Sequence, residues 1–76
     1  MEKIIEKMRN QPHGIRLEEA EKVLAAYGYH FKRQKGSHRH YGNTQGLIIT
    51  LKDPLKISYV TSILERIGEQ QAGEIL

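Results

Sequence analysis

The chain has 76 residues, of which 12 are Lys or Arg and 9 are Asp or Glu, and it contains no cysteine. This length allows one small domain, which excludes a doubly wound nucleotide-binding fold or a barrel enzyme, and no apolar run approaches the ~20 residues of a membrane span. Without cysteine there is no disulfide framework, thiolate metal site or cysteine nucleophile, so the chain suits the reducing cytoplasm, where we expect it to act.

The net charge of +3 hides an uneven distribution along the chain. No acidic residue lies between Glu21 and Asp53, and this window contains six of the basic residues and three of the four histidines. The rest of the chain contains the other six basic residues and all nine acidic ones. A basic centre therefore lies between acidic flanks, and such a centre favours contact with phosphate groups.

The first part of the chain has the periodicity of helices. Residues 2–10 form a short amphipathic pattern, which the Pro and Gly within residues 12–14 should end. Over residues 17–27, apolar side chains recur with the spacing of one helix face. Gly28 tolerates a left-handed backbone, so we expect it to end this second helix.

The pattern then changes to the two-residue period of β-strands. Strands are predicted at residues 29–35, 37–43 and 47–51, and the short connections between them favour an antiparallel meander. Alternation places Phe31 and Gln34 on opposite faces of the first strand. It places His38 and His40 together on one face of the second strand, opposite to Arg39.

After the third strand, Pro54 should end the sheet, and a last amphipathic helix is predicted to begin with Ser58 as its cap and to stop at Gly68. The element order is then α-α-β-β-β-α, which forms a two-layer α+β sandwich with one polar, basic sheet face. The expected core residues are Val23, Leu24, Tyr27, Phe31, Ile49, Val60, Ile63, Leu64 and Ile67. The predicted single domain (1–76) consists of an N-terminal extension (1–16), a core (17–68) and a fraying tail (69–76).

Residues 30–41 bring cations, imidazoles, a small hydroxyl group and aromatic rings onto one predicted hairpin. Four interpretations stay open: a solvated sheet edge, a nucleic-acid-binding surface, a metal site on His38 and His40, and metal-free catalysis. Cleavage of RNA without a metal needs a base, an acid and positive charge at the phosphate, which histidine and basic side chains supply. His38 is the best-placed histidine, because it follows Gly36 and Ser37 at the start of a strand.

The segment Gln34-Lys35-Gly36-Ser37-His38-Arg39-His40-Tyr41 resembles the hallmark of HicA toxins, which are small mRNA interferases with a Gly-Ser-His motif. The flanks are similar as well, with a helix that ends in Gly and an aromatic residue, and an apolar strand followed by a Pro-containing turn and a final helix. The resemblance covers about residues 17–68. It implies a double-stranded-RNA-binding-domain-like fold (α-β-β-β-α), here with an extra N-terminal helix.

The resemblance also implies a function. HicA toxins cleave mRNA and are neutralised by a HicB antitoxin, so we expect a metal-independent endoribonuclease without a cofactor, with mRNA and a HicB-like antitoxin as partners. The essential histidine of the family maps onto His38, and we expect Gly36, Ser37 and His40 to shape the motif and position the substrate. The residues expected to bind RNA are Lys32, Arg33, Lys35 and Arg39. The alternative on the same fold is a non-catalytic RNA- or DNA-binding module.

Overall fold

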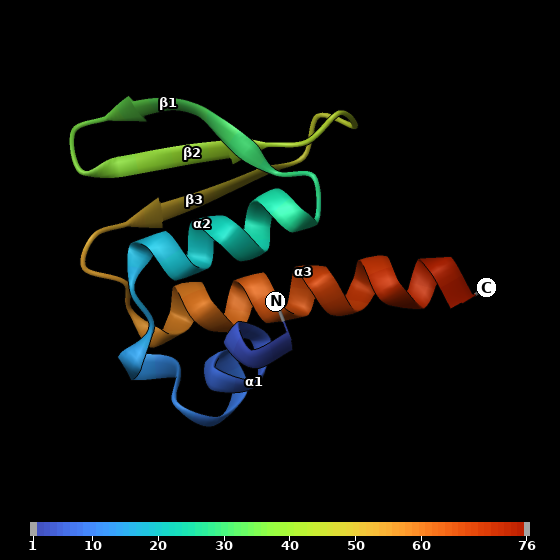
Figure 1. The fold of residues 1–76 in the computed structure, drawn as a ribbon. Coiled ribbons are helices and arrows are strands. Elements are labelled where there is room, and N and C mark those ends of the chain that lie inside the picture. Colours follow the sequence, from blue (N-terminus) through green and yellow to red (C-terminus); the bar gives the residue numbers. More distant parts are fainter. Residues whose placement is uncertain (1, 76) are drawn as a thin grey trace.

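The computed structural model describes residues 2–75, with the side chains of residues 2–68. Its elements in chain order are α1 (Glu2–Asn10), the 3-10 turn η1 (Pro12–Gly14), α2 (Leu17–Ala26), β1 (His30–Lys35), β2 (His38–Gly42), β3 (Ile48–Lys52) and α3 (Ile57–Ile75). The strands form one antiparallel sheet in the order β1-β2-β3, and α2 and α3 lie against one face of it (Figure 1). The expected α+β sandwich with an additional N-terminal helix is confirmed.

A glycine fixes the end of α2, as the sequence predicts. Gly28 has a φ of +89°, which is in the left-handed region. The N–H of Tyr29 donates to the Leu24 carbonyl at 2.8 Å, and the N–H of Gly28 donates to the Ala25 carbonyl at 3.1 Å. These two bonds form a Schellman motif, which satisfies the last carbonyls of the helix and turns the chain into β1.

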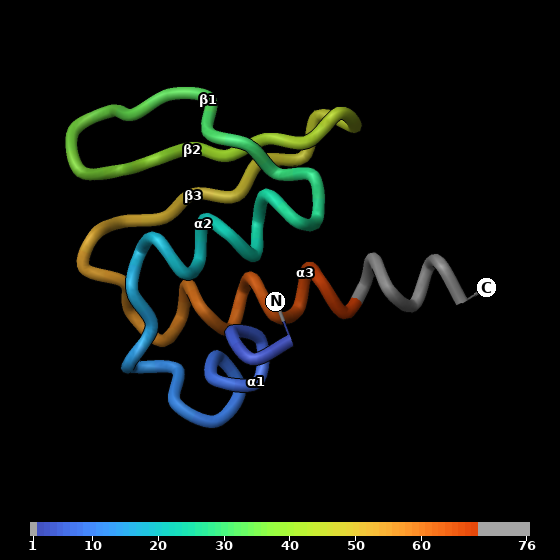
Figure 2. The backbone as a smooth tube through the Cα atoms, viewed as in Figure 1, coloured from blue at the N-terminus to red at the C-terminus, as the bar shows by residue number. Residues whose placement is uncertain are grey.

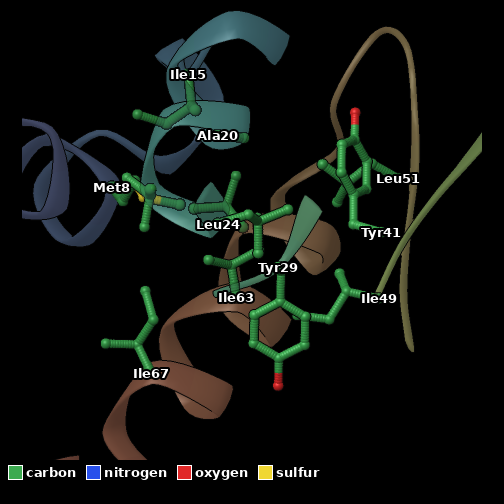
Figure 3. Packing of buried hydrophobic residues seen from close by; sticks show 12 residues of the cluster. Met8, Ile15, Ala20, Leu24, Tyr29, Tyr41, Ile49, Leu51, Ile63 and Ile67 are labelled. Atoms are coloured by element: carbon green, nitrogen blue, oxygen red, sulfur yellow. The ribbon is translucent and has the colours of Figure 1, made fainter. Parts of the chain in front are cut away.

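The apolar core lies between the sheet and the helices and extends to α1 (Figure 3). Its buried members are Met8, Ile15, Ala20, Val23, Leu24, Tyr29, Tyr41, Ile49, Leu51, Val60, Ile63 and Ile67. Of the other expected core residues, Tyr27 and Leu64 are half-buried against this cluster. The prediction for Phe31 is wrong, because 49% of this residue is exposed. It lies on the edge strand β1, so its ring contacts the Tyr41 ring edge-on, with 6.0 Å between centroids, instead of entering the core.

The N-terminal extension is part of this core. Met8 of α1 is fully buried, and Ile15, just after η1, is buried as well. The backbone path in Figure 2 shows α1 beside α3, on the side of the helix layer that faces away from the sheet. The Nζ atom of Lys7 lies 3.1 Å from the Glu19 carboxylate and ties α1 to α2. The extension therefore closes the back of the helix layer.

Both predicted ends of the last helix are wrong. The carbonyl of Lys56 accepts hydrogen bonds from the N–H groups of Tyr59 and Val60, so α3 begins at Ile57 and Ser58 lies inside its first turn. The helix continues through Gly68 to Ile75, so the backbone over residues 69–75 is helical where a fraying tail is expected. A glycine inside a helix costs only about 1 kcal/mol relative to alanine, and the Glu-Gln-Gln-Ala segment that follows favours the helix. Residue 76 lies outside the described residues. Neither α3 nor any other helix in the described part of the chain is long and apolar enough to cross a membrane.

Candidate functional site

A two-residue turn brings β2 back along β1. Gly36 and Ser37 form this turn, and Gly36 has a φ of +60° whereas Ser37 has no positive φ. A positive φ at the first central residue alone is the pattern of a type II′ turn, which matches the twist of paired antiparallel strands. A side chain at position 36 would strain this backbone, so the turn itself requires the glycine of the Gly-Ser-His motif. His38 becomes the first residue of β2.

A β-bulge in β1 changes which face its side chains occupy. Phe31 pairs with Tyr41, but the next paired residue of β1 is Arg33, which pairs with His40, so Lys32 has no residue opposite it. One extra residue in a strand moves all the side chains that follow it to the other face of the sheet. Strict alternation is therefore wrong for the part of β1 beyond this point.

The bulge brings two predicted RNA-binding residues to the face of the histidines. Arg33 is paired with His40 and Lys35 with His38, whereas Gln34, predicted on the face opposite to Phe31, pairs with Arg39 on the helix side. We call the side of the sheet away from α2 and α3 the open face. One row across it consists of Lys35, His38 and Lys52, and the next row consists of Arg33, His40 and Thr50.

Lys32 also reaches the open face, because its side chain lies over Gly42. A Cβ atom built on Gly42 would be only 3.2 Å from the Cε of Lys32 and 3.1 Å from the Cδ1 of Ile48. The glycine thus leaves the space that the lysine chain occupies. The four cations of the open face are Lys32, Arg33, Lys35 and Lys52. None of the three strands contains an acidic residue, so this positive charge is not neutralised within the sheet.

The two histidines of the open face differ in their surroundings. His38 is exposed, and its side chain makes no hydrogen bond within the described residues. His40 is half-buried, and its Nδ1 lies 2.8 Å from Oγ1 of Thr50. This hydrogen bond orients the His40 ring and leaves Nε2 as the nitrogen that can reach a substrate. Because they are two residues apart on one strand, the two imidazoles project from the same face about 7 Å apart.

Arg39 is the one predicted RNA-binding residue that the structure does not bring to the open face. On the helix side, its Nη2 lies 3.2 Å from Oε2 of Glu21, its Nε donates to the Tyr41 hydroxyl at 3.1 Å, and its guanidinium lies 4.8 Å from the centre of the Phe31 ring. The Tyr41 hydroxyl donates to the same Glu21 oxygen at 2.5 Å. The Tyr41 contact raises the pKa of Arg39, and burial raises the pKa of Tyr41. These bonds tie the hairpin to α2, and they pair the charge of Arg39 with that of Glu21.

Two residues of the open face have no signal in the motif. Thr50 and Lys52 belong to β3, at least ten residues along the chain from their partners His40 and His38 on β2, and only the pairing of β2 with β3 places them beside the histidines. The register of β2 with β3 identifies them, since His38 lies opposite Lys52 and His40 lies opposite Thr50.

The open face has the groups that acid–base chemistry at a phosphodiester requires. Histidine is the side chain that can donate or accept a proton near neutral pH, and the nearby ammonium and guanidinium groups attract anions. Across the described residues, no cluster of three or more His, Asp or Glu side chains could hold a metal ion.

Comparison with known proteins gives one match. A family model described as "HicA toxin of bacterial toxin-antitoxin" matches residues 17–69, which include the sheet, α2 and the Gly36-Ser37-His38 turn but not α1. No curated protein and no solved structure matches the chain.

Proposed function

Because the chain belongs to the HicA family, the toxins of bacterial toxin–antitoxin systems, we propose that it is an endoribonuclease that cleaves mRNA in the cytoplasm without a metal ion. The observation that carries this proposal is the position of His38. Its imidazole is exposed between Lys35 and Lys52 on a sheet face whose strands contain no carboxylate. An RNA phosphate placed there meets positive charge and a group that can transfer a proton.

The proposed reaction is attack of a ribose 2′-oxygen on the adjacent phosphorus, with breakage of the bond to the 5′-oxygen. A base takes the proton from the 2′-hydroxyl, and an acid gives a proton to the departing 5′-oxygen, which leaves a cyclic phosphate and a free 5′-hydroxyl. His38 performs one of these transfers, and His40, held by Thr50 with its Nε2 free, is the candidate for the other. Lys35 and Lys52 stabilise the negative charge that develops on the phosphate oxygens.

The same surface supports a proposal about the antitoxin partner. A toxin–antitoxin pair requires a neutralising partner, and we propose a HicB-like antitoxin that covers the open face. An acidic protein would complement its four cations and block access to His38.

The test is cleavage of unstructured RNA by the wild type, His38→Ala and the matched control His13→Ala, each in the presence of a chelator. His13 is an exposed histidine on η1, outside the sheet. We expect His38→Ala to lose cleavage by about 10²–10⁴-fold and His13→Ala to keep it. Equal cleavage by wild type and His38→Ala would contradict the assignment, and loss on chelation would indicate a metal site.

Expression in cells tests the biological part of the proposal. The wild-type chain should arrest growth when expressed alone, and the product of the neighbouring gene should relieve that arrest. Salt-sensitive RNA binding that survives His38→Ala, with no cleavage under any condition, would instead identify a non-catalytic binding module.

A further inference from the structure

A hollow lies at the end of the sheet opposite to the Gly36-Ser37 turn. It is a pocket of about 410 Å³ formed by the α2–β1 connection, the β2–β3 loop and α3. Figures 1 and 2 show that this loop and the β1–β2 turn are at opposite ends of the strands. The pocket volume is within the range of sites for small ligands, about 300–1,000 Å³.

The chemistry of the residues that line the pocket suits an unpaired base. Tyr27, which is half-buried, supplies aromatic surface, Gln45 supplies an amide, and none of the described residues that line the pocket has a carboxylate. Arg66 of α3 is half-buried as a residue and also lines the pocket, and its side chain makes no hydrogen bond or ion pair with the described residues. The five N–H donors of its guanidinium are therefore not taken up by those residues, so a ligand that accepts hydrogen bonds would complete the site.

The loop on one side of the pocket is held in shape by its own hydrogen bonds. Oδ1 of Asn43 accepts from the backbone N–H of Gln45 at 3.0 Å and from that of Leu47 at 2.9 Å. Gly46, with a φ of +83°, closes the turn. The wall that carries Gln45 is therefore preformed, which reduces the entropy lost on binding.

The pocket adjoins the end of β1 and β2 through His30. His30, which lines the pocket, pairs with Gly42 at the end of β2, and the Lys32 side chain lies over that same glycine. Gly42 is four residues along the extended strand from His38, a distance of about 13 Å. This separation matches a few nucleotides of an extended strand, and Lys32 lies between the two positions to contact the connecting phosphates.

We propose that this pocket binds a single base of the RNA strand, a few nucleotides from the bond cleaved at His38, and that Arg66 makes it prefer guanine. Guanine presents two adjacent acceptors, O6 and N7, to which a guanidinium donates in parallel. Proteins that read single-stranded RNA splay its bases out and stack them on aromatic rings, as Tyr27 allows here. The proposal rests on the proposed function for the RNA strand itself, and it adds a site that selects where the strand binds.

The experiment measures binding separately from cleavage. The protein is His38→Ala, and the probes are a fluorescent short oligouridine and variants with one guanosine or one adenosine at each position in turn. We expect guanosine at one position to tighten binding on the order of 10-fold relative to uridine, and adenosine there to gain less. A binding profile of His38→Ala with no guanosine preference at any position would overturn the proposal.

Three substitutions in that background identify the side chain responsible. Arg66→Ala and Arg66→Lys should both lose the guanosine preference, because lysine keeps the charge but cannot form the paired contact. The control Arg9→Ala removes an exposed arginine of α1, outside this pocket, and should keep the preference. If Arg66→Lys keeps the preference, or if Arg66→Ala weakens all the oligonucleotides equally, the residue contacts phosphate and the base site is refuted.

Cleavage by the chain with His38 intact separates this inference from the proposed function. Guanosine-dependent binding without any cleavage would refute the ribonuclease and leave the base site standing. Cleavage without a guanosine preference would do the reverse.

Discussion

Lys35 and Arg39 carry one positive charge each on the same hairpin, and the structure predicts that only one of them binds RNA. Lys35 lies on the open face beside His38, whereas Arg39 lies on the helix side in contact with Glu21 and Tyr41. The two substitutions Lys35→Gln and Arg39→Gln remove the same charge from the chain. We therefore expect them to change the salt dependence of RNA binding differently.

The magnitude follows from the number of cations on the open face. Each phosphate contact to single-stranded nucleic acid contributes about −0.7 to the slope of log K against log salt concentration, so four cations predict a slope of about −3. Lys35→Gln should reduce it to about −2, and Arg39→Gln should leave it near −3. Arg39→Gln should instead lower the melting temperature, because it removes bonds that tie β2 to α2.

The assay is fluorescence anisotropy with labelled oligouridine, in the His38→Ala background so that the RNA stays intact, between about 50 and 200 mM salt. Thermal unfolding of the same samples provides the second measurement. If the two substitutions reduced the slope equally, Lys35 and Arg39 would both contact RNA. The placement of these two residues on opposite faces of the sheet, which depends on the bulge at Lys32, would then be refuted.

Two further predictions concern the N-terminal extension. Met8→Ala should lower the free energy of unfolding by about 2–5 kcal/mol in urea titrations, because it leaves a cavity where a fully buried side chain packs. The control Ile57→Ala, at a residue that is 51% exposed, should lower it by less than about 1 kcal/mol. Equal effects of the two substitutions would show that α1 is not docked. The Arg16 N–H and then the Lys7 ammonium lower the pKa of Glu19 from its ordinary value of 4.5, so their stabilisation is complete above that value and is lost as the pH falls through the lowered pKa. Glu19→Gln should therefore be less stable than wild type at neutral pH, with a difference that shrinks as the pH falls below 4.5, and a difference independent of pH would contradict this account.

Features that depend on neighbouring residues could be predicted from the sequence. The period of apolar residues indicates α2 and the last helix, and Gly28 marks the end of α2 because only a few residues separate it from the carbonyls that it helps to satisfy. The bounds of α3 were harder to predict. Ser58 and Gly68 are both residue types that are common at helix ends, but the helix includes them because the residues on either side favour the helical conformation.

The site was predictable only in part, for the same reason. The Gly36-Ser37-His38 turn is local, so its glycine and histidine could be found from three residues. The placement of Arg33 and Lys35 beside the histidines depends on an unpaired Lys32, and nothing in the alternation of β1 indicates it. Gly42 accommodates the Lys32 chain, but its role is visible only when β1 and β2 are paired.

The sequence by itself therefore determined the elements, the α+β class, the basic centre and the motif with His38. These depend on local periodicity, composition and a turn that needs glycine. Only the tertiary structure decided which cations face the same way as His38, that Thr50 orients His40, and that Arg39 is bound to Glu21. Those relations depend on strand register and on contacts between residues far apart in the chain, and one extra residue in β1 is enough to change the face that a side chain occupies.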